Sequence, residues 1–339
     1  MSLTRYPWHT PVWEHLAQRY YAGQLPHALL LSGNYGLGKS AFSEQLAQSL
    51  LCDEATKAPS ATSATPLLPC GACNGCLLYK AGSHPDLMRV SPESEGKVIT
   101  VDSVRRIAGF LALTSQFARY QIVIVSPAEA MNKYAANSLL KTLEEPTPGV
   151  LLLLVSHDAG SLLPTIRSRC QTISIPVPQE AEADDWLKQA LAHDKLPTEN
   201  AELLMKLADG APLLALEYAK AGTLSSYQQL LQSFEKLAKK QTDPVAEAGL
   251  WVSAGLGVSL KWMYLWVAEL IQFKSAPDMV DNKAILAKPV LGDVAGAADL
   301  ARLYKFLDKI TDSIRTIPTQ ANVQLTLEDL LINWTRLNR

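Results

Sequence analysis

The stretch LLLSGNYGLGKS, Leu29 to Ser40, decides the fold class. It begins as an apolar strand, continues through a glycine-rich loop and ends in a Lys-Ser pair that opens an amphipathic helix. The spacing Gly33-x4-Gly38-Lys39-Ser40 matches a phosphate-binding loop, whose backbone N–H groups converge on phosphate oxygens at a helix N-terminus. Lys39 adds a positive charge and the Ser40 hydroxyl is a ligand for Mg²⁺. We therefore expect a P-loop α/β domain in which Gly33, Gly38, Lys39 and Ser40 are the candidate nucleotide-binding residues.

Hydrolysis of a bound nucleotide also needs an acid on a neighbouring strand to hold Mg²⁺. The best candidate strand is the apolar run 122–125, but Ser126 and Pro127 follow it where acidic residues are expected. Glu129 and Asp158 come later after their strands and are weaker candidates. The sequence favours a nucleotide site without its hydrolytic half. The alternative is a self-sufficient ATPase that uses Glu129 or Asp158.

Apolar strands alternate with helical patterns up to about residue 178, which is typical of a parallel sheet covered on both faces. The further strands are expected at 86–90, 120–126, 149–156 and 171–177. Asp102 is expected to cap one of the intervening helices. Only helical patterns follow. We expect three domains: an α/β domain over 1–178, a small helical domain over 179–222 and a helical domain over 223–339.

Composition narrows the class of protein. The chain has 339 residues, is 48% hydrophobic and carries a formal net charge of -2, so a strongly basic nucleic-acid binder is not indicated. The first residues contain no apolar signal-peptide core. The longest uncharged apolar run of the C-terminal half, 248–260, is too short to span a bilayer. We expect a cytoplasmic protein.

Four of the five cysteines form a metal-ligand pattern. Cys70-x2-Cys73-x2-Cys76 follows Cys52 across a loop rich in Ala, Thr, Ser and Pro, 53–69. Four thiolates suit tetrahedral Zn²⁺, and such a closed site is structural. An iron–sulfur cluster and unligated thiols are the alternatives. His84 is a possible substitute for one cysteine.

Two arginines lie in TIRSRC, Thr165 to Cys170, just before the last predicted strand. The guanidinium fork suits a phosphate of another molecule. From spacing alone, Arg167 and Arg169 are more commonly solvated or ion-paired surface residues. Cys170 is expected to be a buried residue at the strand edge, because no partner base accompanies it.

Together these features resemble AAA+ clamp-loader proteins. The phrase NSLLKTLEEP (137–146), the SRC turn (168–170) and the four-cysteine insertion carry the resemblance. It covers residues 1 to about 220 closely and the remainder loosely. It implies an AAA+ P-loop domain with a zinc module over 52–76, a small helical lid and an all-α collar that joins a ring.

The chain departs from the ATPase subunits of that family at positions that those subunits need for ATP hydrolysis. Ser126 and Pro127 replace the acidic pair, and Leu213 stands where those subunits carry a sensor arginine. The resemblance therefore implies a subunit of the DNA polymerase III assembly without independent catalysis. Its Arg169 would act as an arginine finger in trans on ATP held by an adjacent ATPase subunit.

The partners implied by the resemblance are the gamma/tau ATPase subunits, the delta subunit, the β sliding clamp and primed DNA. Whether the chain's own loop holds ATP or ADP is left open. A plain zinc-containing DNA-binding protein is a third possibility, disfavoured by the near-neutral charge.

Overall fold

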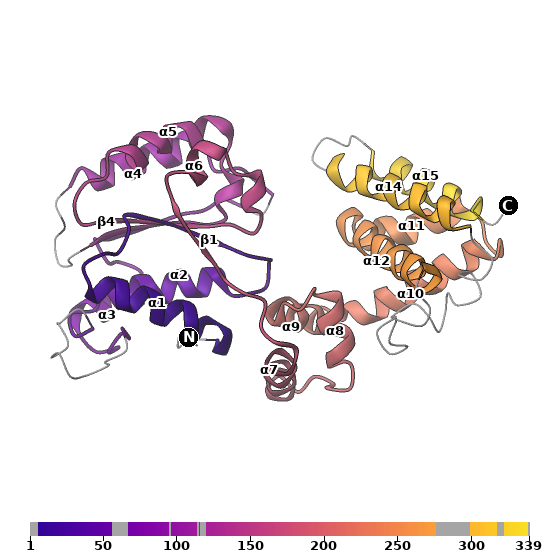
Figure 1. Ribbon diagram of the computed structural model, residues 1–339, viewed down its shortest axis with the longest axis horizontal. Helices are drawn as coiled ribbons and strands as arrows, with labels where there is room; N and C mark the ends of the chain where they lie inside the picture. The colour runs from indigo at the N-terminus through magenta and orange to yellow at the C-terminus, as the bar shows by residue number, and fades with distance from the viewer. Residues whose placement is uncertain are drawn as a thin grey trace. The chain divides into compact units, whose positions relative to one another are not determined.

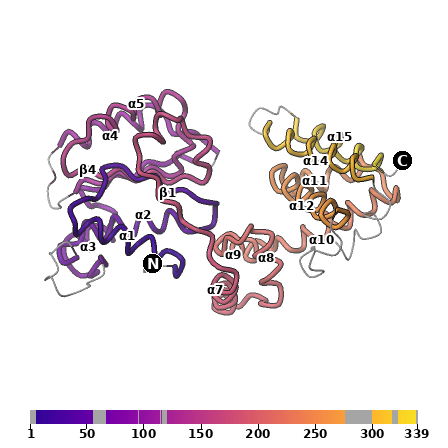
Figure 2. The backbone as a smooth tube through the Cα atoms, viewed as in Figure 1, coloured from indigo at the N-terminus to yellow at the C-terminus, as the bar shows by residue number. Residues whose placement is uncertain are grey.

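The computed structural model describes residues 6–55, 67–94, 96–113, 115, 120–275, 299–316 and 322–337. The chain divides into two compact units (Figures 1 and 2). Unit 1 comprises Met1–His193 and Ala208–Ala215, and unit 2 comprises Asp194–Leu207 and Leu216–Arg339. The expected three-domain division at 178 and 222 stays a prediction. Among the described helices, none is long and apolar enough to cross a membrane.

Unit 1 contains a five-stranded parallel sheet of order β2-β3-β4-β1-β5, which confirms the expected α/β class. The strands are β1 (Ala28–Ser32), β2 (Leu87–Val90), β3 (Gln121–Val125), β4 (Val150–Val155) and β5 (Gln171–Ser174). The strand of the P-loop, β1, lies between β4 and β5. Every residue of β3 and β4 is buried, as continuous apolar strands inside a parallel sheet should be.

Helices cover both faces of this sheet. Figure 1 shows α4, α5 and α6 on one face and α1 and α2 on the other. The α-helices up to the end of this region are α1 (Thr10–Tyr21), α2 (Lys39–Leu50), α3 (Asn74–Lys80), α4 (Val101–Leu111), α5 (Lys133–Glu144), α6 (Pro164–Arg167) and α7 (Glu180–His193). The short 3₁₀ turns are η1 (Pro7–His9), η2 (Ala128–Ala130) and η3 (Ala159–Ser161). Alternate strand residues enter different cores: Leu29 and Leu31 pack on one side, and Leu30 on the other.

Local signals misplaced two boundaries. The expected Asp102 cap is wrong: Thr100 is the N-cap of α4 and its hydroxyl accepts the Ser103 N–H at 3.4 Å. Asp102 instead pairs with Arg105 in the first turn, at 3.0 Å. Strand β5 is shorter than expected, and the proline at position 176 offers no N–H to continue a ladder. Most of the predicted loop 53–69 lies outside the described residues.

The described part of unit 2 is helical, as expected. Helix α9 (Pro212–Lys220) passes from unit 1 into unit 2. The other helices are α8 (Ala201–Leu207), α10 (Thr223–Ala238), α11 (Pro244–Ser253), α12 (Leu256–Ser275), α14 (Leu300–Thr316) and α15 (Val323–Thr335). The aromatic run 262–270 supplies Trp262, Met263 and Trp266 to a core that also contains Phe234 and Trp334. These apolar side chains therefore form the core of the unit itself.

Candidate functional site

The P-loop has the geometry that the sequence predicts. It leaves β1 at Ser32 and enters α2 through Gly38, whose φ of 81° is a left-handed conformation that favours glycine. Lys39 is buried, and its Nζ donates to the carbonyl oxygens of Gly33 and Asn34, at 2.6 Å each. An ammonium group has three N–H donors, so one is left to point at a phosphate. The loop is therefore pre-organised for an anion.

The electrostatics of the loop centre on Lys39. Burial lowers the pKa of Lys39 to about 8, while the carboxylate of Glu129 raises it. The ammonium form therefore predominates at neutral pH and is available to an anion. Burial also lowers the pKa of His157, and the charge of Lys39 lowers it further. The imidazole of His157 consequently adds no second positive charge at neutral pH.

Aromatic residues of the N-terminal segment contact the backbone of the loop. Trp8 Nε1 donates to the carbonyl oxygen of Leu37 at 3.0 Å, and His9 Nε2 lies 2.8 Å from the same oxygen. The N–H of Leu213, in α9, donates to the carbonyl oxygen of Gly36 at 3.1 Å. Leu213, at the expected sensor position, therefore touches the loop through its backbone. Its leucine side chain brings no charge to a phosphate.

Ser126 stands where, from the sequence, a metal-binding acid is expected in a hydrolytic site. Ser126 follows β3, and its Oγ lies 3.3 Å from Oγ of Ser40. Of the two alternative acids, Glu129 accepts the backbone N–H of His157 through Oε1 at 2.8 Å, and Asp158 accepts that of Gly160 at 3.0 Å. A hydroxyl pair has no net charge with which to hold Mg²⁺.

The SRC turn presents Arg169 in a fixed conformation. Its Nη2 forms an ion pair with Glu144 at 2.6 Å, and its Nη1 donates to Thr165 O at 3.0 Å. Ser168 Oγ accepts from the same nitrogen at 3.3 Å. About a third of the Arg169 side chain, 35%, is exposed. The guanidinium is thus both oriented and accessible. The partner Glu144 lies within the NSLLKTLEEP motif, although the sequence carries no signal that pairs it with a residue 25 positions later.

Arg169 and the P-loop lie at opposite ends of two adjacent parallel strands, β5 and β1. Arg169 precedes the first residue of β5, whereas Gly33 follows the last residue of its parallel neighbour β1. Gln171 is in register with Leu29, four residues before Gly33. At about 3.3 Å per residue, the level of Gln171 is roughly 13 Å from the start of the loop.

The four cysteines converge as their spacing predicts. Cys52 follows α2, Cys73 is the N-cap of α3 and Cys76 lies in its first turn. The sulfur atoms of these three and Cys70 all lie within 4.8 Å of one another. The sulfurs of Cys52 and Cys73 are 3.7 Å apart. Zn–S bonds of about 2.3 Å place tetrahedral sulfurs roughly 3.8 Å apart, so the cluster fits a zinc ion.

Backbone N–H groups surround the sulfurs. Backbone N–H groups donate to them at 3.3 to 3.5 Å, from Ala55, Cys70, Gly71, Ala72, Cys73 and Cys76. The donors from Ala72 and Cys73 lower the pKa of Cys70 to about 6, whereas burial raises the pKa of Cys76. Thiolates that receive N–H bonds are the ligands of a closed structural site.

The two remaining candidates are separate from these sites. His84 is buried, its Nδ1 accepts the N–H of Asp86 at 3.1 Å, and it is not part of the cysteine cluster. Cys170 is buried, as expected, and burial raises its pKa to about 11. A thiol with such a pKa is a poor nucleophile at neutral pH.

Family models match most of the chain. A model described as "DNA polymerase III, delta subunit" matches residues 8–179, and one described as "DNA polymerase III, delta subunit, C terminal" matches residues 221–336. The first contains the P-loop, the cysteine cluster and the SRC turn. The second lies within unit 2.

Curated relatives extend over nearly the full length. The chain is 36% identical to DNA polymerase III subunit delta′ of Pseudomonas aeruginosa over 341 residues, which covers 98% of each chain. It is 34% identical to the delta′ subunit of Haemophilus influenzae, covering 96% of this chain and 95% of that one. It is 29% identical to the tau/gamma subunit of the same organism, over 58% of this chain and 27% of that protein. The chain therefore belongs to the delta′ family of DNA polymerase III subunits.

Proposed function

We propose that the chain is a clamp-loader subunit that completes an ATPase site of a neighbouring subunit without being an ATPase. In this role it assembles with the gamma/tau ATPase subunits and the delta subunit in the bacterial cytoplasm. The assembly loads the β sliding clamp onto primed DNA. The similarity to a tau/gamma subunit supports a common ancestor for the two kinds of chain.

The position of Arg169 carries this proposal. An arginine finger stabilises the charge that develops on the transferred phosphoryl group. Arg169 lies at the amino ends of the strands, whereas the chain's own P-loop lies at their carboxyl ends. Glu144 holds Arg169 in this position. The nucleotide that it serves is therefore one bound by another subunit.

The P-loop supports nucleotide binding without turnover. Lys39 keeps one donor for a phosphate, and Gly33, Gly38 and Ser40 complete the cradle. The Ser126 hydroxyl beside Ser40 and the apolar Leu213 leave Mg²⁺ and the γ-phosphate without their usual charged partners. ATP or ADP bound here would act as a structural ligand.

The cysteine cluster supports a structural zinc ion. Cys52, Cys70, Cys73 and Cys76 would supply four thiolates, and a closed tetrahedral site leaves no position for substrate. The ion would join the end of α2 to the start of α3 and add folding free energy to this part of unit 1. The helices of unit 2 would form this subunit's portion of the collar.

The proposal is tested with purified subunits. The isolated chain should show negligible ATP hydrolysis, and adding it to the gamma/tau and delta subunits should raise DNA-stimulated hydrolysis by the assembly. Robust turnover by the isolated chain, abolished by Lys39→Ala, would contradict the proposal and favour the self-sufficient ATPase.

A further inference from the structure

The four cysteines of the cluster differ in their exposure to solvent. Cys52 and Cys76 are fully buried, at 0% exposure each, whereas Cys73 is half-buried and Cys70 is exposed. Cys52 follows α2 and Cys76 lies inside α3, while Cys70 lies on the turn that leads into α3. One ligand of the cluster is therefore open to solvent, and two are enclosed by the protein.

Cys73 is the cysteine best placed to react with Cys70. Its backbone N–H donates to Cys70 Sγ at 3.3 Å, and the sulfur atoms of both residues belong to the group that lies within 4.8 Å. Cys73 is also less buried than Cys52 and Cys76. A solvent-accessible thiolate next to a second cysteine is the arrangement found at redox-sensitive thiols.

We propose that Cys70 is the site at which hydrogen peroxide oxidises the cluster, and that the product is a Cys70–Cys73 disulfide with release of the zinc ion. The inference rests on the proposed zinc site for the ion that is released. The order of reaction among the cysteines rests only on their exposure and on the contact between Cys70 and Cys73.

The reaction has two steps. The Cys70 thiolate attacks one oxygen of the peroxide, so that an S–O bond forms, the O–O bond breaks and hydroxide leaves. The Cys73 thiolate then attacks the sulfur of the Cys70 sulfenic acid, an S–S bond forms and a second hydroxide leaves. Both hydroxides take protons from solvent, and the two electrons that reduce the peroxide come from the two thiolates. Only Cys52 and Cys76 remain as ligands, too few for a closed zinc site.

Helix α3 has attachments to unit 1 that do not depend on the ion. The Tyr79 hydroxyl donates to the carbonyl oxygen of Glu44 in α2 at 3.1 Å. The Glu44 carboxylate also accepts two hydrogen bonds from Arg89 in β2, at 2.7 Å each. Oxidation should therefore release zinc while α3 stays in place, so that reduction and added zinc restore the site.

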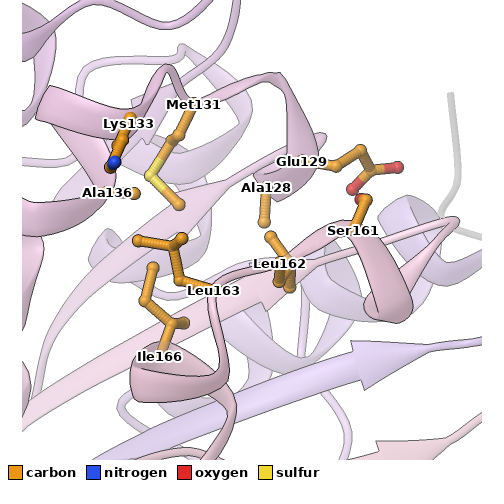
Figure 3. A pocket seen from close by; sticks show the side chains of 9 residues that line it. All are labelled: Ala128, Glu129, Met131, Lys133, Ala136, Ser161, Leu162, Leu163 and Ile166. Carbon is orange, nitrogen blue, oxygen red and sulfur yellow. The ribbon is translucent and has the colours of Figure 1, made fainter.

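Cys170 provides an internal comparison. It is 8% exposed and packs in one core with Leu162 and Ile166. These two side chains also line a cavity of about 210 Å³, and Cys170 is not among the nine described residues that form its lining (Figure 3). A peroxide molecule in that cavity does not meet the Cys170 thiol. Cys170 should therefore stay reduced while Cys70 reacts.

The first test maps the oxidised cysteines in the full-length chain. The reduced protein is treated with less than one equivalent of hydrogen peroxide and quenched in acid, and its peptides are identified by mass spectrometry. We expect the Cys70–Cys73 disulfide to exceed any disulfide between Cys52 and Cys76 about tenfold or more, with Cys170 unmodified. A first product that joins Cys52 to Cys76, or that modifies Cys170, overturns the inference.

A variant without the second cysteine isolates the first step. In Cys73→Ser the sulfenic acid has lost its expected partner, so dimedone, a reagent for sulfenic acids, should label Cys70. The labelled residue is informative whether or not this variant retains zinc. The matched control is Cys170→Ser, which should form the Cys70–Cys73 disulfide as the wild type does. Dimedone labelling of Cys52 or Cys76 ahead of Cys70 contradicts the assignment.

The second test follows the ion. A chromophoric zinc chelator should report one zinc released for each Cys70–Cys73 disulfide formed, while the far-ultraviolet circular dichroism stays unchanged, and dithiothreitol with added zinc should reverse the release. Zinc that stays bound after the disulfide has formed overturns the proposed release. If metal analysis of the untreated reduced chain finds no zinc, the proposed zinc site fails, and the peptide mapping still decides the role of Cys70.

Discussion

Replacing Gly75 by alanine should have two opposing effects. Alanine favours helix formation, but its Cβ should disturb the geometry of the cysteine cluster. Gly75 lies in α3, one residue before Cys76, and a Cβ there would be 2.2 Å from the carbonyl oxygen of Leu51. Leu51 in turn precedes Cys52. Real side chains essentially never come within 3.0 Å in this way, so α3 would have to move by about 1 Å away from the end of α2.

The expected effects have opposite signs. Alanine in a helix is favoured over glycine by about 1 kcal/mol, whereas overpacking costs about 1–3 kcal/mol. Zinc binding suffers more, because ligand distances tolerate only about 0.2 Å and the movement would separate Cys76 from Cys52. We expect Gly75→Ala to weaken zinc binding about 10- to 100-fold.

Competition with a chromophoric zinc chelator measures the affinity, and thermal unfolding with and without EDTA measures its contribution to stability. The control is Gly109→Ala in α4, where a Cβ meets nothing within 4 Å. This variant should gain up to about 1 kcal/mol and leave zinc binding unchanged. Wild-type zinc affinity in a folded Gly75→Ala protein would refute the reasoning.

Three further predictions concern other parts of the chain. The pKa of Lys39 falls from 10.5 to about 8 on folding, so the unfolded chain binds more protons than the folded chain between these pH values. This group therefore makes the free energy of unfolding rise with pH across that window. Urea unfolding of Lys39→Met should lack that component of the rise, and pH profiles of identical slope would contradict it. Phe234 is buried and stacks on Trp334 with ring centroids 3.9 Å apart. Phe234→Ala should therefore lower the free energy of unfolding of unit 2, measured with denaturant, by about 3–5 kcal/mol. A loss below about 1 kcal/mol would show that the stack contributes little. Cys170, with its pKa near 11, should react with a thiol reagent at pH 8 about 100-fold more slowly in the folded protein than in denaturant, and equal rates would show that the thiol is accessible.

Local patterns were enough to predict the P-loop, the parallel sheet and the cysteine cluster. The glycine spacing from Gly33 to Gly38, the unbroken apolar run of β4 and the CxxCxxC spacing each act within a few residues. The structure adds what depends on distant parts of the chain. The apolar residues of the run 262–270 are one example, because their packing partners in the core of unit 2 come from other helices.

Pairings between separate elements could not be predicted in the same way. Glu144 and Arg169 meet because α5 and the SRC turn end at the same edge of the sheet. Glu129 turns to the N–H of His157 because η2 and the end of β4 are neighbours in space. No periodicity or motif records either contact, since each depends on strand order.

The most direct test of the central claim is DNA-stimulated ATP hydrolysis by the reconstituted assembly with Arg169→Ala. The proposal predicts that turnover at the one ATPase site completed by Arg169 is nearly lost, so total hydrolysis falls while the subunits still assemble, because an arginine finger contributes orders of magnitude in rate at its own site. Arg105→Ala, at an exposed arginine of α4, should have no effect. Undiminished hydrolysis with Arg169→Ala in a fully assembled complex would contradict the account.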